Sequence, residues 1–194
     1  MQEIEAKFPD ITIEDIRQRL KDNQADLVLP MRVMHRAVFD NDYMKERNGF
    51  LRVRDEGNKT TITYKQFNPD DTSDVLEQEI TTNSFDSAIQ LFSRLGIQPR
   101  STQESKRETW SLNGCEVVID IWPWLNPYVE IEGETWESVK QTAELLGFTW
   151  SDALFGDVMA AYRYQYPHLS NDDTIGTIAS VTFESELPEL LQAS

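Results

Sequence analysis

The sequence predicts an α+β fold: a closed eight-stranded antiparallel β-barrel with helices packed outside it. About eight segments alternate polar with apolar residues, and short turns join many of them. Helical segments interrupt the strands in a few places instead of following every strand, which favours hairpins over parallel strands. About eight antiparallel strands are enough to close a small barrel.

The first half of the chain contains most of the predicted hairpins. Strands are predicted at 1–8, 31–40, 49–55, 59–67 and 75–81, and a helix at 12–25. Thr12 caps the helix, Pro30 breaks the chain before the second strand, and Gly57 with Asn58 forms a turn between two strands.

The second half also contains both strands and helices. Helices are predicted from Asn83 or Ser84 to Leu95, at 135–146 and at 152–166, and strands at 103–111, 115–122 and 128–133. Gly96 and Gly147 end the first two helices, and Asn113-Gly114 is a hairpin turn. We expect a barrel domain over 1–166 and an acidic C-terminal extension over 167–194, with a short strand at 178–183. The sequence leaves open whether this extension is ordered.

Composition narrows the classes of function. The chain has 34 acidic and 18 basic residues among 194, a net charge of −16, which argues against binding to a nucleic-acid backbone. Its mean hydropathy is −0.52, and no apolar run approaches the roughly 20 residues of a membrane-spanning helix. The N-terminus lacks a signal-peptide pattern, and the single cysteine, Cys115, suits a reducing compartment. We therefore expect a cytoplasmic protein without a membrane partner.

Charged residues recur at alternate positions in several of the strands, so that these strands have one charged face. For one strand, a face turned to water is the ordinary interpretation. Recurrence along the chain instead favours a charged lumen that holds water, ions and a charged ligand, because unpaired buried charges are costly. Carboxylates suit Mg²⁺ or Mn²⁺, whereas Lys and Arg suit phosphate oxygens. The lumen therefore suits a metal-complexed polyphosphate.

The ordered series of motifs resembles the CYTH superfamily, the triphosphate tunnel metalloenzymes. The series comprises Glu3-x-Glu5-x-Lys7, Leu51-Arg52-Val53-Arg54, Tyr64-Lys65, Glu77-x-Glu79, Lys106-Arg107, Asp120 and Val129-Glu130-Ile131-Glu132-Gly133. The resemblance implies a closed eight-stranded tunnel. It implies metal ligands at Glu3, Glu5, Asp120, Glu130 and Glu132, and triphosphate binding by Lys7, Arg52, Arg54, Lys65 and Arg107. It places catalysis at Glu3, Glu5, Lys7, Glu130 and Glu132, and makes Glu77 and Glu79 a secondary acidic pair that orients the basic side chains.

Three functions remain open at this point. The first is metal-dependent hydrolysis of inorganic tripolyphosphate, thiamine triphosphate or a nucleoside triphosphate. The second is a class IV adenylyl cyclase that converts ATP to cyclic AMP and pyrophosphate, and the third is a non-catalytic binder of nucleotides or polyphosphate. We expect a small-molecule triphosphate as the partner, and a homodimer stays open. The loop Trp122–Pro127 departs from the family pattern, and Arg163 is the nearest candidate for a C-terminal basic residue.

Overall fold

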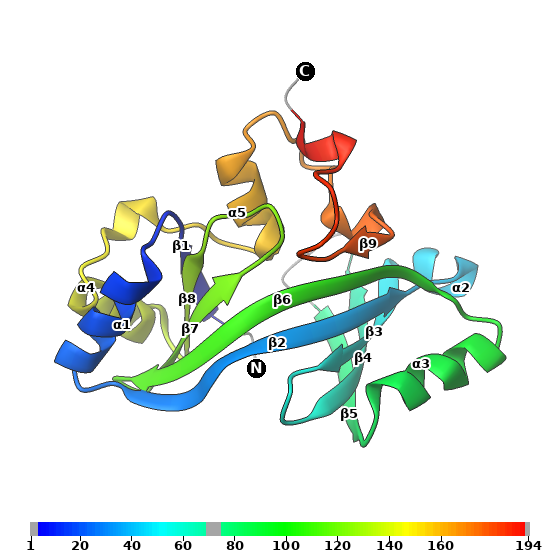
Figure 1. The fold of residues 1–194 in the computed structure, drawn as a ribbon, viewed down its shortest axis with the longest axis horizontal. Helices are drawn as coiled ribbons and strands as arrows, with labels where there is room; N and C mark the ends of the chain where they lie inside the picture. The colour runs from blue at the N-terminus through cyan, green and yellow to red at the C-terminus, as the bar shows by residue number, and fades with distance from the viewer. Residues whose placement is uncertain (1–3, 69–74, 193–194) are drawn as a thin grey trace. The chain divides into compact units, whose positions relative to one another are not determined.

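The computed structural model describes residues 4–68 and 75–192, and its elements are shown in Figure 1. The strands are β1 (Ile4–Phe8), β2 (Asp26–Phe39), β3 (Gly49–Asp55), β4 (Thr60–Phe67), β5 (Val75–Thr82), β6 (Pro99–Leu112), β7 (Cys115–Ile121), β8 (Tyr128–Gly133) and β9 (Ser180–Val181). The helices are α1 (Ile13–Asp22), α2 (Asp42–Lys45), α3 (Phe85–Arg94), α4 (Trp136–Leu145) and α5 (Val158–Gln165). Three short 3₁₀ helices are η1 (Trp150–Asp152), η2 (Ile175–Thr177) and η3 (Glu189–Leu191).

The strands form one hydrogen-bonded sheet in the order β1-β8-β7-β6-β2-β3-β4-β5, with β9 added alongside β6. The pairs β1/β8, β7/β8, β6/β7, β2/β3, β3/β4 and β4/β5 are antiparallel, and β9 is parallel to β6. The predicted antiparallel sheet of about eight strands with helices is confirmed. Over the described residues the path has two end strands, β1 and β5, so the predicted closure into a barrel is not confirmed.

The chain divides into two compact units. Unit 1 contains residues 1–32, 105–173 and 186–194, and unit 2 contains residues 33–104 and 174–185. The long strands β2 and β6 each have 14 residues and contribute to both units. The C-terminal extension beyond residue 166 also contributes to both, because η2 and β9 belong to unit 2 and η3 to unit 1.

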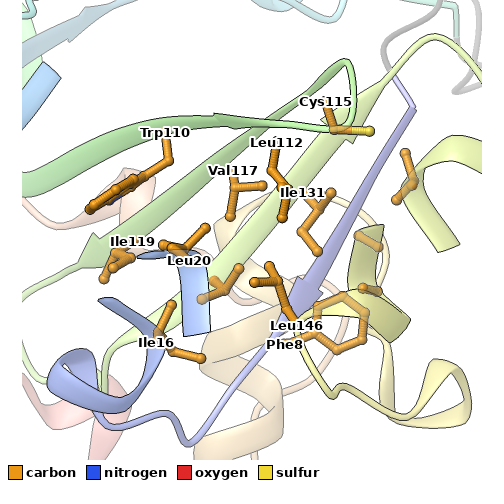
Figure 2. Packing of buried hydrophobic residues seen from close by; sticks show 14 residues of the cluster. Phe8, Ile16, Leu20, Trp110, Leu112, Cys115, Val117, Ile119, Ile131 and Leu146 are labelled. Carbon is orange, nitrogen blue, oxygen red and sulfur yellow. The ribbon is translucent and has the colours of Figure 1, made fainter. Parts of the chain in front are cut away.

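In unit 1, α1 and α4 cover the apolar face of β1, β8 and β7 (Figure 2). Alternate strand residues form this face, and the helices add residues spaced by three or four. The buried cluster consists of Ala6, Phe8, Ile16, Leu20, Trp110, Leu112, Cys115, Val117, Ile119, Val129, Ile131, Val139, Ala143 and Leu146. Gly133 allows α4 to approach β8, because a Cβ there would lie 2.9 Å from both Cys115 Sγ and Ser138 Oγ.

In unit 2, α3 covers the apolar face of β2, β3 and β4. Ala37, Phe39, Val53 and Ala88 are buried there, and Leu51, Ile62, Phe85, Ile89, Phe92 and Ile97 pack against them. Ser84 caps α3 by accepting a hydrogen bond from the backbone N–H of Ser87, and Gly96, with φ +83°, follows its end. This helix therefore begins and ends close to where the sequence predicts.

Several element boundaries differ from the prediction: β6 begins at Pro99 instead of residue 103, and α1 ends at Asp22 instead of residue 25. β2 begins at Asp26 and continues through Pro30, where a break was predicted. Pro30 lies outside the β2/β3 ladder, which covers only His35–Phe39, so its missing N–H costs no hydrogen bond in that ladder. α5 begins at Val158 instead of residue 152, because Gly156 has φ +101° and Asp157 then caps the helix. No helix in the described part of the chain is long and apolar enough to span a membrane.

Candidate functional site

The predicted site residues of unit 1 lie on the sheet face opposite its apolar core. Lys7 pairs in register with Glu130, and Glu5 pairs with Glu132, across β1 and β8. Since Ala6, Phe8, Val129 and Ile131 belong to the core, alternation directs these four charged residues to the other face. Glu3 lies outside the described residues, so its predicted role stays a prediction.

Lys7 is held by three acceptors although its side chain is only 2% exposed. Its Nζ lies 2.6 Å from Glu5 Oε1, 3.0 Å from Glu130 Oε2 and 2.6 Å from the Gly156 carbonyl oxygen. Burial lowers the pKa of Lys7, but the carboxylates of Glu130 and Glu5 raise it by more, so the pKa is raised overall. Lys7 therefore stays charged at neutral pH and holds two of the predicted metal ligands.

Arg107 makes a second charged cluster on the same face, with Asp120 and Glu130. Its Nε and Nη2 donate to the two oxygens of Asp120 at 2.7 and 2.6 Å, and Nη2 also contacts Glu130 Oε1 at 3.2 Å. Burial lowers the pKa of Arg107, but the negative charges of Asp120 and Glu130 raise it by more. The pKa of Arg107 is therefore raised well above its ordinary value. Glu130 thus lies between Lys7 and Arg107, and connects the two clusters.

Tyr128 is a further member of this cluster that the alternation pattern did not single out. Its hydroxyl donates to Asp120 Oδ2 at 3.1 Å, and its side chain is buried. Burial, together with the negative charges of Asp120 and Glu130, raises the pKa of Tyr128 well above its ordinary value. Its position two residues before Glu130 was the available signal, since residues two apart on a strand share a face.

The carboxylates of this face fit a divalent metal ion by their chemistry. Glu132 lies opposite Glu5 on one side and Glu116 on the other, so carboxylates from three strands share one register position. Oxygen ligands of this kind suit Mg²⁺ or Mn²⁺. Over residues 4–68 and 75–192, however, no three His, Cys, Asp or Glu side chains come together closely enough to hold a metal ion. Lys7 and Arg107 contact Glu5, Glu130 and Asp120 instead.

Unit 2 places the other predicted cations on the sheet face opposite its own apolar core. Arg52 and Arg54 alternate with the core residue Val53 on β3. Lys65 of β4 lies opposite Phe50 of β3. Burial and the neighbouring charge of Arg54 lower the pKa of Arg52 to about 10, although the carboxylates of unit 2 oppose this shift. The Nε atoms of Arg52 and Arg54 are buried and make no hydrogen bond with any residue the structure describes.

Acidic side chains of unit 2 contact these cations or lie among them. Arg54 Nη2 contacts Glu56 Oε1 at 2.5 Å, and Lys65 Nζ contacts Glu77 Oε2 at 2.8 Å. Glu79 accepts a hydrogen bond from the Thr63 hydroxyl at 2.7 Å, and Thr63 lies opposite it across β4 and β5. Glu77 thus contacts one of the predicted cations and Glu79 contacts Thr63, and the orienting role of the pair stays a prediction. Glu56 was missed because it follows the end of β3 and lies outside the strand pattern.

The region that departs from the family pattern is held by α5. Tyr162 donates to the Pro123 carbonyl oxygen at 2.7 Å, and Gln165 donates to the Trp124 carbonyl oxygen at 2.9 Å. Arg163 donates to the carbonyl oxygens of Ser170, Asn171 and Asp173. Those bonds fix the loop after α5, so in this structure the guanidinium of Arg163 serves the local backbone.

The sequence matches the CYTH domain family over residues 1–150. The chain belongs to the CYTH domain family. A comparison with curated protein sequences gives no match.

Solved structures share this fold. A conserved hypothetical protein from Pyrococcus furiosus has a TM-score of 0.62 and 25% identity, covering 78% of this chain and 94% of that chain. A candidate adenylate cyclase from Vibrio parahaemolyticus has a TM-score of 0.67 and 12% identity, covering 82% and 96%. A candidate adenylyl cyclase from Hippeastrum, described as having a dominant triphosphatase activity, has a TM-score of 0.51 and 16% identity, covering 84% and 95%.

Proposed function

We propose that this CYTH-domain protein is a phosphohydrolase that acts on a triphosphate with the help of a divalent metal ion. The observation that carries the proposal is the presence of two charged sheet faces in one CYTH chain. One is rich in carboxylates held by Lys7 and Arg107, and the other carries Arg52, Arg54 and Lys65. The closed eight-stranded tunnel implied by the family resemblance is part of this proposal, as is a cytoplasmic setting without a nucleic-acid or membrane partner.

The cations of unit 2 would bind the phosphate oxygens. Phosphoryl transfer depends mainly on positioning and on charge stabilisation of the oxygens around phosphorus. Arginine offers paired donors to those oxygens, and lysine adds a point charge. The buried Nε atoms of Arg52 and Arg54, which have no acceptor among the described residues, support this role.

The carboxylates of unit 1 would hold the metal ion. Glu5, Glu130 and Glu132 supply oxygen ligands, and we keep Asp120 and Glu3 in the set from the family resemblance. A bound Mg²⁺ or Mn²⁺ would supply Lewis-acid polarisation of phosphate and neutralisation of its charge. In the structure Lys7 and Arg107 hold Glu130 in place and balance its charge. We propose that a carboxylate of this group also accepts the proton of the attacking water.

The second candidate is an adenylyl cyclase, in which the ribose 3′-hydroxyl attacks the α-phosphorus and pyrophosphate leaves. This reaction is the second candidate because the structure is similar to that of a candidate adenylate cyclase from Vibrio parahaemolyticus. Hydrolysis is placed first because the related Hippeastrum protein is described as having a dominant triphosphatase activity. A non-catalytic binder is less favoured, because binding alone does not need so many metal-type carboxylates.

Product analysis separates these functions. The protein is incubated with ATP, thiamine triphosphate or tripolyphosphate and with Mg²⁺ or Mn²⁺, and the products are resolved. Orthophosphate with the corresponding diphosphate supports hydrolysis, whereas cyclic AMP with pyrophosphate supports the cyclase. If none of the three compounds yields either set of products, the protein is a non-catalytic binder.

Glu130→Gln tests the metal assignment. We expect turnover to fall by at least about 100-fold, because the neutral amide weakens metal binding and releases Lys7 and Arg107 from a shared partner. The matched control is Glu144→Gln on the exposed surface of α4, which should keep full activity. Full activity of Glu130→Gln, or activity that survives a chelator, would refute the metal assignment.

A further inference from the structure

Arg36 on β2 lies among the cations of unit 2, although no motif of the sequence singled it out. It stands directly opposite Arg54 in the β2/β3 register, and its neighbours Ala37 and Phe39 belong to the apolar core. Alternation therefore directs Arg36 to the same face as Arg52, Arg54 and Lys65. The Nε atom of Arg36 is buried, as are those of Arg52 and Arg54.

Three carboxylates of unit 2 contact other side chains of this face. Glu56 contacts Arg54 at 2.5 Å and Lys59 at 3.7 Å, and Glu77 contacts Lys65. The contact of Glu79 is with the Thr63 hydroxyl. Burial and Arg54 lower the pKa of Arg52 to about 10 against the opposing effect of Glu77, Glu79 and Glu56, so positive charge dominates around Arg52.

Like charges directly opposite each other on antiparallel strands destabilise a sheet. Arg36 and Arg54 form such a pair on the charged face, and Arg52 lies two residues from Arg54 on the same strand. Three arginines in this arrangement are favourable when an anion with several charged oxygens binds them together, since each guanidinium can donate two parallel hydrogen bonds.

We propose that Arg36 is a fourth phosphate-binding cation of unit 2, which acts together with Arg52, Arg54 and Lys65 and adapts the site to a chain of several phosphates. The inference rests on the proposed function, because it assigns a further residue to the same phosphate-binding face. The four cations lie on three neighbouring strands, β2, β3 and β4, at spacings of about 5 Å between strands. A single phosphate cannot engage groups so spread, whereas a linear triphosphate can.

The test measures binding of tripolyphosphate, pyrophosphate and orthophosphate by calorimetry, with a chelator present to prevent turnover. We expect Arg36→Gln to bind tripolyphosphate about tenfold more weakly than the wild-type protein, the usual effect of losing one charge-assisted contact. Orthophosphate binding should change less than about threefold. Arg36→Lys, which keeps the charge and loses the paired donors, should lose about threefold and serves if Arg36→Gln does not fold.

Arg94→Gln is the matched control, because Arg94 lies exposed on α3 in the same unit and the substitution removes the same charge. It should change the affinity less than twofold. If Arg36→Gln behaves like Arg94→Gln while Arg52→Gln weakens binding, the inference about Arg36 is wrong and the proposed function stands. If neither the wild-type protein nor any variant binds tripolyphosphate, the inference about Arg36 is wrong, and product analysis with Mg²⁺ or Mn²⁺ decides the proposed function separately.

Discussion

Arg52 is the residue at which stability and the proposed function oppose each other. Burial and Arg54 lower its pKa to about 10. The folded chain therefore binds fewer protons than the unfolded chain above about pH 10, and stability from this group rises as the pH rises through that window. Below it, Arg52 is charged in both states, and its burial beside another cation costs stability. An anion bound to the guanidinium would offset that cost.

This predicts that Arg52→Met stabilises the free protein while weakening its ligand binding. We expect the free energy of unfolding at pH 7.5 to rise by about 1 kcal/mol in the absence of phosphate, because a buried charge is removed. Tripolyphosphate should then raise the melting temperature less than it does for the wild-type protein. Thermal unfolding with and without tripolyphosphate measures both effects, and Arg94→Met is the surface control. A lower melting temperature for free Arg52→Met would contradict this account.

Single residues of the site were predictable to the extent that strand alternation governs them. Arg52 and Arg54 share a face because they are two apart, and Lys7 meets Glu130 because β1 and β8 pair in that register. The pattern could not show that the Gly156 carbonyl oxygen is the third partner of Lys7, since this contact joins positions 149 residues apart. Arg36 was missed because Val, Met and Phe dominate its strand and its two arginines, Arg32 and Arg36, form no alternating charged pattern.

At the scale of elements, α5 supports the loop between two site-bearing strands. The loop joins β7, which carries Asp120, to β8, which carries Tyr128. Trp124 in this loop has φ +61°, which costs a residue with a side chain roughly 1 kcal/mol or more. The hydrogen bonds that Gln165 and Tyr166 donate to the Trp124 carbonyl oxygen oppose that cost.

Tyr162→Phe should therefore destabilise unit 1 more than an equivalent change elsewhere on α5. The substitution leaves the buried Tyr162–Pro123 contact without its donor, which costs about 1–3 kcal/mol in the free energy of unfolding. Tyr164→Phe is the control, because the Tyr164 side chain is half exposed on the same helix and its loss should cost under about 0.5 kcal/mol. Equal unfolding midpoints in denaturant for the two variants would show that α5 does not hold this loop.

Most elements were predictable because their signals are local. β3 and β8 match their predicted bounds, and α3 and α4 end before the glycines that the sequence marks. The errors have different causes. Pro30 was assigned a chain break from its missing N–H, but β2 runs through it, and the β2/β3 ladder does not include Pro30. The start of α5 depends on backbone bends at Gly156 and Asp157 that residue composition did not reveal.

At the scale of the whole molecule, the two charged faces belong to different units. Lys7, Arg107 and the predicted metal ligands that the structure describes lie in unit 1, whereas Arg36, Arg52, Arg54 and Lys65 lie in unit 2. The sequence shows both sets but not this division, because β2 and β6 each pass from one unit into the other. The alternation of residues along a strand shows which face a side chain lies on, but it does not show which unit the strand belongs to.

The C-terminal extension is the part of the molecule whose role composition left open. Its residues are divided between the two units. In unit 2, β9 pairs with Thr102 and Gln103 of β6. In unit 1, His168 contacts the Leu190 carbonyl oxygen. Val181 and Leu191 are both almost fully buried. The extension thus contributes to the core of each unit, although acidic residues dominate its sequence.

This arrangement predicts that truncating one buried side chain per unit destabilises the protein. Val181→Ala in unit 2 should cost about 2 kcal/mol in the free energy of unfolding, and Leu191→Ala in unit 1 about 3 kcal/mol, because each leaves a cavity. Leu187→Ala is the control, since Leu187 is 41% exposed and lies between them in the sequence. Its cost should stay under about 1 kcal/mol. Chemical denaturation of the full chain gives the three values. If all three variants unfold together with the wild-type protein, the extension would be an appendage that neither unit needs, and the burial of Val181 and Leu191 would carry no stabilising energy.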